Sequence, residues 1–287
     1  MPDAALFVSG LTYSFGEVRA VDNLSVEVNA GEIVGLLGPN GAGKSTTIRM
    51  LTGQLQPQSG SITILGQSMP AARERIQARM GVCFEEKNVY DAMSAAENLR
   101  FFASLFGFKP FDPMPLLERV DLAGRADDRV STYSKGMRQR LMMARSLINE
   151  PDILFLDEPT DGLDPVSSRT IRNLIKDQAA RGAAVMLTTH DMFEADELSD
   201  RVAFINEGSI LAIDTPEELK LAHGQRSVKV RTRTDGKISE VVVPLDDPNA
   251  TEQLRQAMST GHILTIHTEE ATLEDIFIEF AGRGLSA

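Results

Sequence analysis

The chain has 287 residues, of which 42% are hydrophobic, and its formal net charge is −12. That length suits one large domain with an appendage or two modest domains, and the apolar content is enough for a sizeable core. The acidic balance argues against a general nucleic-acid surface, which needs a basic face. No apolar run is long enough to predict a membrane span.

The single cysteine, Cys83, lies within an apolar run, and we interpret it as a small buried hydrophobic residue. No disulfide can form within the chain, so we expect a reducing compartment. The first ten residues lack a basic stretch followed by an apolar one, and no secretory signal is predicted.

The first part of the chain is rich in strand patterns. Strand-like runs at 5–15, 24–28 and 32–37 alternate with short turns. Two more buried-strand patterns, at 153–159 and 183–190, each lie next to a helical segment. Apolar runs that alternate with helices are typical of a mostly parallel sheet in an α/β domain.

Helix start signals occur at three points. Ser94-Ala-Ala-Glu97 and Thr215-Pro216-Glu-Glu218 fit the capping box, in which a hydroxyl and an acid satisfy the first turn of a helix. Asp191 to Glu194 is a weaker third signal. The stretch from about 87 to 135 contains helical patterns without strands and predicts a helical insertion.

The last third of the chain has shorter, more alternating patterns. Residues 202–211 predict a hairpin that turns at Glu207-Gly208. Beyond residue 225 the pattern predicts two alternating strands around Asp235-Gly236, then a helix, a strand and a final helix. The predicted boundaries are 1–225 for the α/β domain, about 87–145 for a helical subdomain within it, and 226–287 for a small α+β domain.

The segment GLLGPNGAGKST closes an apolar strand, opens a helix and fits the phosphate-loop pattern. Its glycines let backbone N–H groups converge on an anion, and the helix adds a partial positive charge at its N-terminus. We expect Lys44 to reach the β- and γ-phosphates and Ser45 to ligate magnesium. The predicted nucleotide-binding residues of this loop are Gly38, Pro39, Asn40, Gly41, Ala42, Gly43, Lys44, Ser45 and Thr46.

Two acids end the strand ILFLDEP. Asp157 and Glu158 fall at its carboxyl end, where ligands bind in open α/β sheets. Asp157 suits contact with magnesium, and Glu158 is expected to polarise a water for in-line attack on the γ-phosphorus. The alternative for Glu158 is a helix-capping or solvated acid.

Three further elements narrow the class of NTPase. Residues 133–140 precede Asp157, residues 160–165 follow it, and Thr189-His190 ends the next strand. This order resembles the ATP-binding subunits of ABC transporters, over residues 4 to about 222. The resemblance implies an α/β P-loop NTPase core with a mixed sheet, N-terminal antiparallel strands and a helical subdomain.

The resemblance also implies how ATP and Mg²⁺ are bound. Residues 38–46 match the Walker A loop, and 153–158 match Walker B. Ser134 and Gly136 match the signature loop, written YSKGM here where the family more commonly has LSGGQ. In the family this loop contacts the γ-phosphate of ATP bound to the opposite subunit.

Three further matches follow from the resemblance. Leu163 and Asp164 match the D-loop, and His190 matches the switch histidine that acts with Glu158. Phe15 lies where the family has an aromatic residue that stacks on adenine. Taken singly, Ser134 and Asp164 are ordinary helix caps, a lone histidine is more often structural, and a lone phenylalanine is more often core. The joint order favours the family roles.

The ending ATLEDIFIEFAGR, residues 271–283, resembles the C-terminal extension of ATPase subunits of type-2 ABC exporters. The resemblance implies a subunit on the cytoplasmic face of the cell membrane that powers a separate membrane permease. It further implies a second ATPase subunit, most simply in a homodimer with ATP at the interface, and no nucleic-acid partner. The alternative is that residues 226–287 serve only to stabilise the chain or to dimerise it.

Two rival functions come from other classes. The first is a soluble ABC ATPase that acts on DNA or the ribosome. The net charge of −12 and the lack of coiled-coil insertions or a tandem second cassette argue against it. The second is a regulatory subunit that binds ATP without turnover, and the retained Glu158 argues against that.

A departure from the family occurs where the apolar run 82–84 ends in Glu85 and Glu86. The family has a glutamine at the first of these positions, which reaches toward magnesium and the attacking water. Glutamate only accepts hydrogen bonds and carries charge, whereas glutamine is neutral and also donates. We predict that Glu85 takes the glutamine's role at the metal and that Glu86 is solvated or faces the permease. The alternative is a solvated loop.

Overall fold

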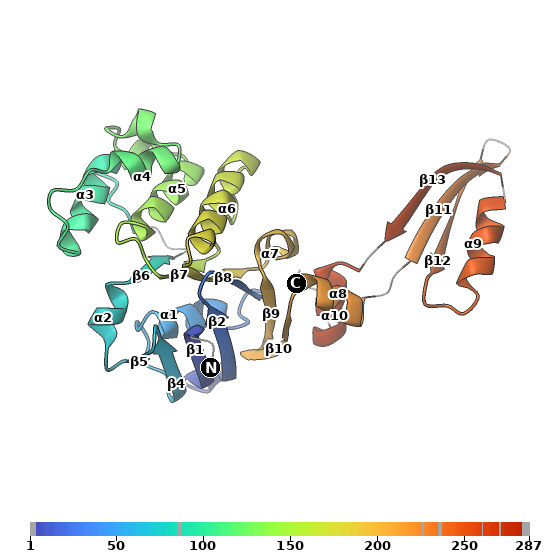
Figure 1. The fold of residues 1–287 in the computed structure, drawn as a ribbon, viewed down its shortest axis with the longest axis horizontal. Coiled ribbons are helices and arrows are strands. Elements are labelled where there is room, and N and C mark those ends of the chain that lie inside the picture. The colour runs from blue at the N-terminus through green and yellow to red at the C-terminus, as the bar shows by residue number, and fades with distance from the viewer. Residues whose placement is uncertain are drawn as a thin grey trace. The chain divides into compact units, whose positions relative to one another are not determined.

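The structure is a computed structural model that describes residues 4–84, 88–224, 227–234, 237–259, 261–269 and 271–282. These residues form two compact units, which divide between Ile213 and Asp214 (Figure 1). The division lies earlier than the predicted boundary after residue 225, because helix α8 (Pro216–His223) packs on α10 (Leu273–Ala281).

A six-stranded sheet forms the centre of the first unit, in the order β10-β9-β3-β8-β7-β6. The sheet is mostly parallel, as the sequence predicts. Parallel pairs form between β3 and β8, β3 and β9, β7 and β8, and β6 and β7. Glu207 and Gly208 both have positive φ, which fits a two-residue turn between β9 and β10. The strands are β3 (Ile33–Leu37), β6 (Met80–Cys83), β7 (Ile153–Asp157), β8 (Ala184–Thr189), β9 (Arg201–Asn206) and β10 (Ser209–Asp214).

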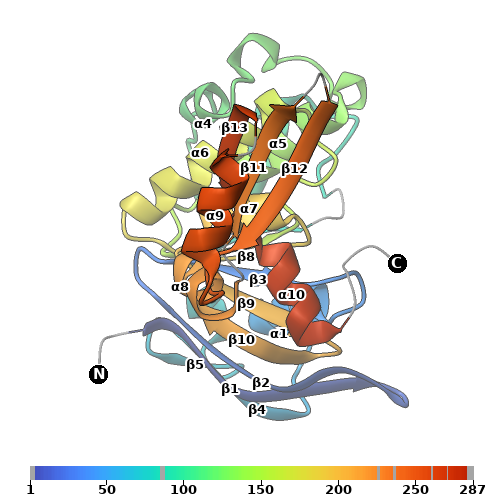
Figure 2. The same ribbon diagram turned by 90° about the vertical axis from the view of Figure 1, so that its right-hand side faces the viewer.

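A second, antiparallel sheet has the order β2-β1-β4-β5 and confirms the predicted N-terminal antiparallel strands (Figure 2). Helix α1 (Lys44–Leu51) contributes Ile48 and Leu51 to an apolar core that this sheet shares with the central sheet. The strands are β1 (Ala4–Phe15), β2 (Val18–Asn29), β4 (Ser59–Ile64) and β5 (Gln67–Met69).

The predicted helical insertion is present in the described residues of the first unit. Ser94 and Glu97 form the reciprocal hydrogen bonds of a capping box at the start of α3. Leu99 of α3 and Leu141 of α5 belong to the apolar core that these helices share with α6. Besides α1, the helices of the unit are α2 (Arg73–Gln77), α3 (Ala95–Leu105), α4 (Met114–Arg119), α5 (Lys135–Ser146), α6 (Pro165–Ala180) and α7 (Met192–Leu198), with 3₁₀ turns at Ala123–Arg125 and Val130–Thr132.

The second unit is α+β, as predicted from residue 226 on. Its antiparallel sheet has the order β12-β11-β13, and α9 lies on one face of it (Figures 1 and 2). Val228 and Val230 of β11 pack with Ala257 of α9. The elements are β11 (Ser227–Thr234), β12 (Lys237–Pro244), α9 (Ala250–Ser259) and β13 (His262–Glu269).

Two of the predicted start signals differ in detail from the capping box. Thr215 accepts a hydrogen bond from the Glu218 amide, but its own amide donates to Asp214 instead of Glu218. Asp191 caps α7 without a reciprocal bond from Glu194. None of the helices described here is both long and apolar enough to cross a membrane.

Candidate nucleotide site

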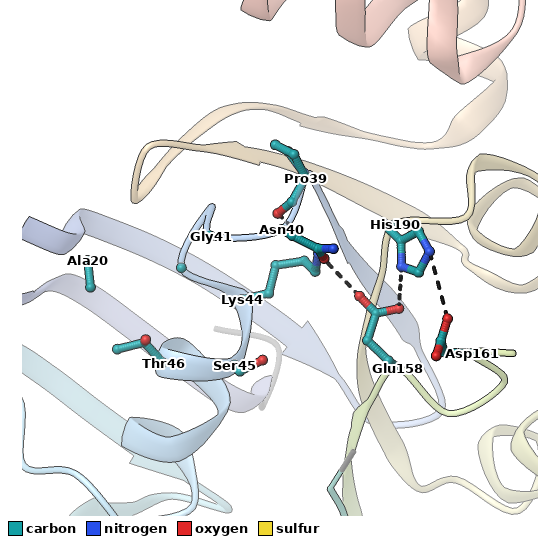
Figure 3. Close-up of a pocket in the computed structure, with 11 residues that line it drawn as sticks. Ala20, Pro39, Asn40, Gly41, Lys44, Ser45, Thr46, Glu158, Asp161 and His190 are labelled. Carbon is teal, nitrogen blue, oxygen red and sulfur yellow. Dashed lines mark hydrogen bonds and ion pairs between the residues drawn. The ribbon is translucent and has the colours of Figure 1, made fainter. Parts of the chain in front are cut away.

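The phosphate loop joins β3 to α1 at the carboxyl edge of the central sheet (Figure 3). Gly43, which precedes the helix, has φ of 104°, a backbone conformation that side chains rarely adopt. A Cβ atom on Gly43 would lie 2.3 Å from the carbonyl oxygen of Ala20, and one on Gly38 would lie 2.2 Å from that of Ile205. The loop therefore requires glycine at both positions.

Lys44 points back across this loop and is only 6% exposed. Its Nζ donates to the carbonyl oxygens of Gly38, at 2.6 Å, and Pro39, at 3.3 Å. It also lies 3.2 Å from Glu158 Oε1, an ion pair whose geometry is not that of a directed hydrogen bond. The ammonium group is thus held at the loop by the main chain and by one acid.

Asp157 and Ser45 meet although they are far apart in the sequence. Ser45 Oγ donates to Asp157 Oδ1 at 3.2 Å, and Thr188 Oγ1 donates to the same oxygen at 2.5 Å. A hydroxyl and a carboxylate are the oxygen ligands that Mg²⁺ prefers, so the donor set fits that ion. Among the described residues no cluster of three or more His, Cys, Asp or Glu side chains could hold a metal.

Glu158 lies one residue beyond the end of β7 with φ of 48°, uncommon for a residue with a side chain. Its amide donates to the carbonyl and the hydroxyl oxygen of Thr188, at 3.2 and 3.1 Å. Its Oε2 lies 2.9 Å from His190 Nδ1, and His190 Nε2 lies 3.9 Å from Asp161 Oδ1 (Figure 3). The structure therefore brings together Lys44, Glu158 and His190, which the sequence predicts from three separate segments.

These residues surround a cleft of about 230 Å³. Gly38 and Ala42 of the phosphate loop are not part of its lining, and sequence reasoning missed two residues that are. Ala20 of β2 carries no chemical signal, and Asp161 stands out only because it follows Glu158 so closely. The lining residues are Ala20, Pro39, Asn40, Gly41, Gly43, Lys44, Ser45, Thr46, Glu158, Asp161 and His190 (Figure 3).

Besides Gly38 and Ala42, three predicted nucleotide-binding residues lie outside this lining. Phe15, at the end of β1, is 50% exposed and contacts Tyr13 edge-to-face, with ring centroids 4.9 Å apart. Ser134 is exposed and caps α5, accepting from the Met137 amide at 3.2 Å. Gly136 is buried against α6, where a Cβ atom would lie 2.6 Å from Ser167 Oγ.

The signature and D-loop segments also meet within the chain. Lys135 Nζ lies 3.3 Å from Asp161 Oδ2. Asp164 caps α6 by accepting from the amides of Val166 and Ser167, both at 3.0 Å. The hydrogen bonds from Ser167 and Val166 hold the pKa of Asp164 below its ordinary value. The capping roles considered for Ser134 and Asp164 are confirmed, and their roles toward a second subunit stay predictions.

Glu85, the predicted metal ligand that departs from the family, lies outside the described residues, as does Glu86. Their predicted roles therefore stay predictions. The preceding strand β6 ends at Cys83, which pairs with Leu156 of β7.

Comparison with known proteins assigns the family. The profile of the ABC transporter family matches residues 21–161. A fluoroquinolones export ATP-binding protein of Mycobacterium tuberculosis (strain CDC 1551 / Oshkosh) is 47% identical, over 97% of this chain and 94% of that protein. This chain belongs to the ABC transporter family. The predicted fold class and family resemblance are confirmed.

Other similar proteins agree with this assignment. The Nod factor export ATP-binding protein I of Paraburkholderia xenovorans (strain LB400) is 43% identical, over 76% of this chain and 73% of that protein. A solved structure of the ATP-binding subunit of an ABC transporter has a TM-score of 0.70 and 29% identity, over 76% of this chain and 92% of that one. The chain is an ABC ATPase that binds ATP, and it acts with a membrane partner.

Proposed function

We propose that this ABC ATPase drives export through a separate permease subunit, and that the charged cleft between the phosphate loop and Glu158 is its hydrolytic site. The observation that carries the proposal is the set of contacts among Lys44, Glu158 and His190, which places a cation, an acid and an imidazole on one cleft. ATP is the substrate. Positioning and charge neutralisation, rather than covalent chemistry, then supply most of the lowering of the barrier.

Each group has a role in this proposal. The backbone N–H groups of residues 38–46 and Lys44 bind the phosphates, and Phe15 stacks on the adenine. Glu158 accepts a proton from the attacking water, and His190 orients Glu158 through its Nδ1. Ser45 and Asp157 would hold Mg²⁺, which supplies charge neutralisation on the phosphate oxygens when bound.

The proposed assembly contains two ATPase subunits. Ser134 and Gly136 of one subunit would face the γ-phosphate bound to the other, because Ser134 is exposed at the N-terminus of α5, where backbone N–H groups favour an anion. ATP would then join the two subunits, and hydrolysis would release them. The symmetric solution is a homodimer with two identical sites.

Export is supported by the relatives, whose names describe fluoroquinolone and Nod factor export. The similarity to the fluoroquinolone exporter subunit covers 97% of this chain and therefore includes most of its C-terminal unit. We take a fluoroquinolone as the first candidate substrate. The chain would lie on the cytoplasmic face of the membrane, attached through the permease.

The deciding experiment compares the parent chain with Glu158→Gln and Ser134→Arg. Glu158→Gln should bind ATP, lose at least about a hundredfold in hydrolysis and accumulate as an ATP-dependent dimer in size-exclusion chromatography. Ser134→Arg should bind ATP as a monomer and form no dimer, because the larger side chain blocks closure. Equal hydrolysis by the parent and Glu158→Gln would refute the role of Glu158.

Export itself is tested with a permease subunit captured from membranes by affinity to this chain. Inverted membrane vesicles that contain both proteins should accumulate a fluorescent fluoroquinolone when ATP is added, and vesicles with the Glu158→Gln chain should not. ATP hydrolysis without any accumulation of drug would set that substrate aside. Failure to copurify with the permease would refute the assembly.

A further inference from the structure

A buried acid that the proposed reaction does not use lies beside the cleft. Glu194, in the first turn of α7, is 1% exposed. Burial raises the pKa of its carboxyl, and the charges of Asp191 and Glu158, both acidic, raise it further. No described basic side chain forms an ion pair with it, so its negative charge is not neutralised there. A carboxylate in such a place destabilises the fold unless its oxygens make specific contacts.

The hydroxyl of Thr160, in the loop after β7, makes such a contact. Thr160 Oγ1 donates to Glu194 Oε1, and the polar side chain of Thr189, at the end of β8, also lowers the pKa of Glu194. Thr160 lies two residues after Glu158, and Thr189 lies directly before His190. Glu194 thus touches the chain next to both groups that act on the water in the proposed reaction.

The threonines extend the connection to the phosphate loop. The carbonyl oxygen of Thr189 accepts from the Gly38 amide at 3.4 Å, and its hydroxyl oxygen accepts from the Asp191 amide at 3.0 Å. The loops after β3, β7 and β8 are therefore linked within a few hydrogen bonds of Glu194.

We propose that Glu194 is a positioning residue, which links the loop after β7 to the loop after β8 and so holds Glu158 and His190 at the distance the reaction needs. This inference rests on the roles proposed above for those two residues. Glu158 adopts an uncommon backbone conformation, which persists only where the surroundings fix it. Its amide is fixed by Thr188 from one side, and the chain beyond it is fixed by Thr160 and Glu194.

A carboxylate suits this task because both of its oxygens accept hydrogen bonds, so the Thr160 hydroxyl always meets an acceptor. Glutamine at this position has the same shape but only one acceptor oxygen, so its contact with Thr160 is weakened while the buried charge disappears. Stability and activity should then change in different directions, since removal of an uncompensated charge stabilises and loss of a link misplaces Glu158.

The test uses Glu194→Gln with Glu197→Gln as the matched control. Glu197 lies on the same helix but is 39% exposed and pairs with Arg172 and Lys176. Glu194→Gln should lower kcat of ATP hydrolysis about ten- to hundredfold, with ATP affinity almost unchanged and resistance to urea at pH 8 not reduced. Glu197→Gln should leave kcat unchanged.

Thr160→Val supplies a second variant that leaves the acid in place. It should reproduce the loss in kcat, and the double variant Glu194→Gln/Thr160→Val should be no slower than the slower single variant, because both remove the same link. In ¹⁵N spectra of labelled histidine, the His190 signal, assigned with His190→Gln, should shift in Glu194→Gln and stay in place in Glu197→Gln.

Unchanged kcat in the folded Glu194→Gln and Thr160→Val chains would overturn the proposal, as would a loss of kcat that merely follows a loss of stability. Glu158→Gln separates this outcome from failure of the proposed function. If Glu158→Gln is inactive while Glu194→Gln is fully active, only the positioning role is refuted. If Glu158→Gln hydrolyses ATP at the parent rate, the site itself has been misassigned.

Discussion

Lys44 and Glu158 form an ion pair inside the cleft, with Nζ 3.2 Å from Oε1 and neither side chain more than 10% exposed. Each charge offsets the desolvation of the other, so removal of one leaves a buried charge without its partner. A γ-phosphate that enters the cleft competes with Glu158 for the same ammonium group. In the proposed reaction, nucleotide binding thus frees the carboxylate that acts on water.

Lys44→Ala should abolish tight ATP binding and lower the free energy of unfolding by about 3 kcal/mol, because Glu158 is left buried and unpaired. The double variant Lys44→Ala/Glu158→Gln should recover most of that stability without recovering ATP binding. Urea unfolding and a fluorescent ATP analogue measure the two effects. Equal stability of the two variants would show that the ion pair contributes little.

Phe15→Ala should raise the Kd for ATP about tenfold if the ring stacks on the base, since stacking on an aromatic side chain is worth about 1–3 kcal/mol. GTP should lose affinity by a similar factor, because every base has a face that stacks. Phe7 is the matched control, a phenylalanine on the same strand that is 47% exposed against 50% for Phe15. A similar loss of affinity in Phe7→Ala would point to the strand rather than the ring.

Gly43→Ala should destabilise the fold more than Gly41→Ala. Both glycines have positive φ, at 104° and 82°, so both substitutions introduce backbone strain of about 1–3 kcal/mol. Only at Gly43 does the added Cβ atom also meet another backbone, at 2.3 Å from Ala20, whereas nothing lies within 4 Å at Gly41. Thermal unfolding of the two variants gives the difference, and equal melting temperatures would contradict the close approach at Ala20.

Cys83 should be inert in the folded protein. Burial raises the pKa of its thiol to about 12, so almost no thiolate forms at pH 8. Iodoacetamide at pH 8 should label the native chain very slowly and the urea-unfolded chain rapidly. Because this is the only cysteine, the labelling rate reports opening around β6 directly. Fast labelling of the native chain would show that this strand opens without global unfolding.

The pH dependence of stability should carry a contribution from Glu194. Folding raises the pKa of Glu194. Its contribution to the free energy of unfolding is therefore fully present below the pKa of an unfolded glutamate, about 4.3, and is lost as the pH rises through the pKa in the folded chain. Relative to the parent, Glu194→Gln should therefore become more stable between pH 5 and pH 8, and Glu197→Gln should not. If the difference in stability between the parent and Glu194→Gln, measured by urea unfolding, is the same at pH 5 and pH 8, the raised pKa is contradicted.

Much of the site could be predicted because its signals are local. The glycines and Lys44 lie in one short segment, and the acids Asp157 and Glu158 close one apolar strand. Helix caps are local signals as well. The hydroxyl of Ser134 accepts from the amide of Met137, only three residues further along the chain.

The rest of the site depends on contacts between distant segments. Ala20 lines the cleft but its side chain is only a methyl group, so nothing in the sequence marks it as part of the site. Glu194 is read from the sequence as part of a helix start, and only packing of α7 shows that it is buried and faces Thr160. The sequence predicts α8 in the first domain, because a capping signal says nothing about the element on which the helix packs.

The contact at Ala20 involves three main-chain segments. Its carbonyl oxygen lies against Gly43 of the phosphate loop and against Gly208 in the turn after β9, and Gly208 in turn donates to the Ala42 carbonyl oxygen at 3.0 Å. Phe15 pairs with Val18 on the strand that carries Ala20. The spacing between the Phe15 ring and the phosphate loop is therefore set by backbone atoms. If the ring stacks on the base as proposed, surface substitutions can alter the affinity of either end without changing the length of nucleotide that fits between them.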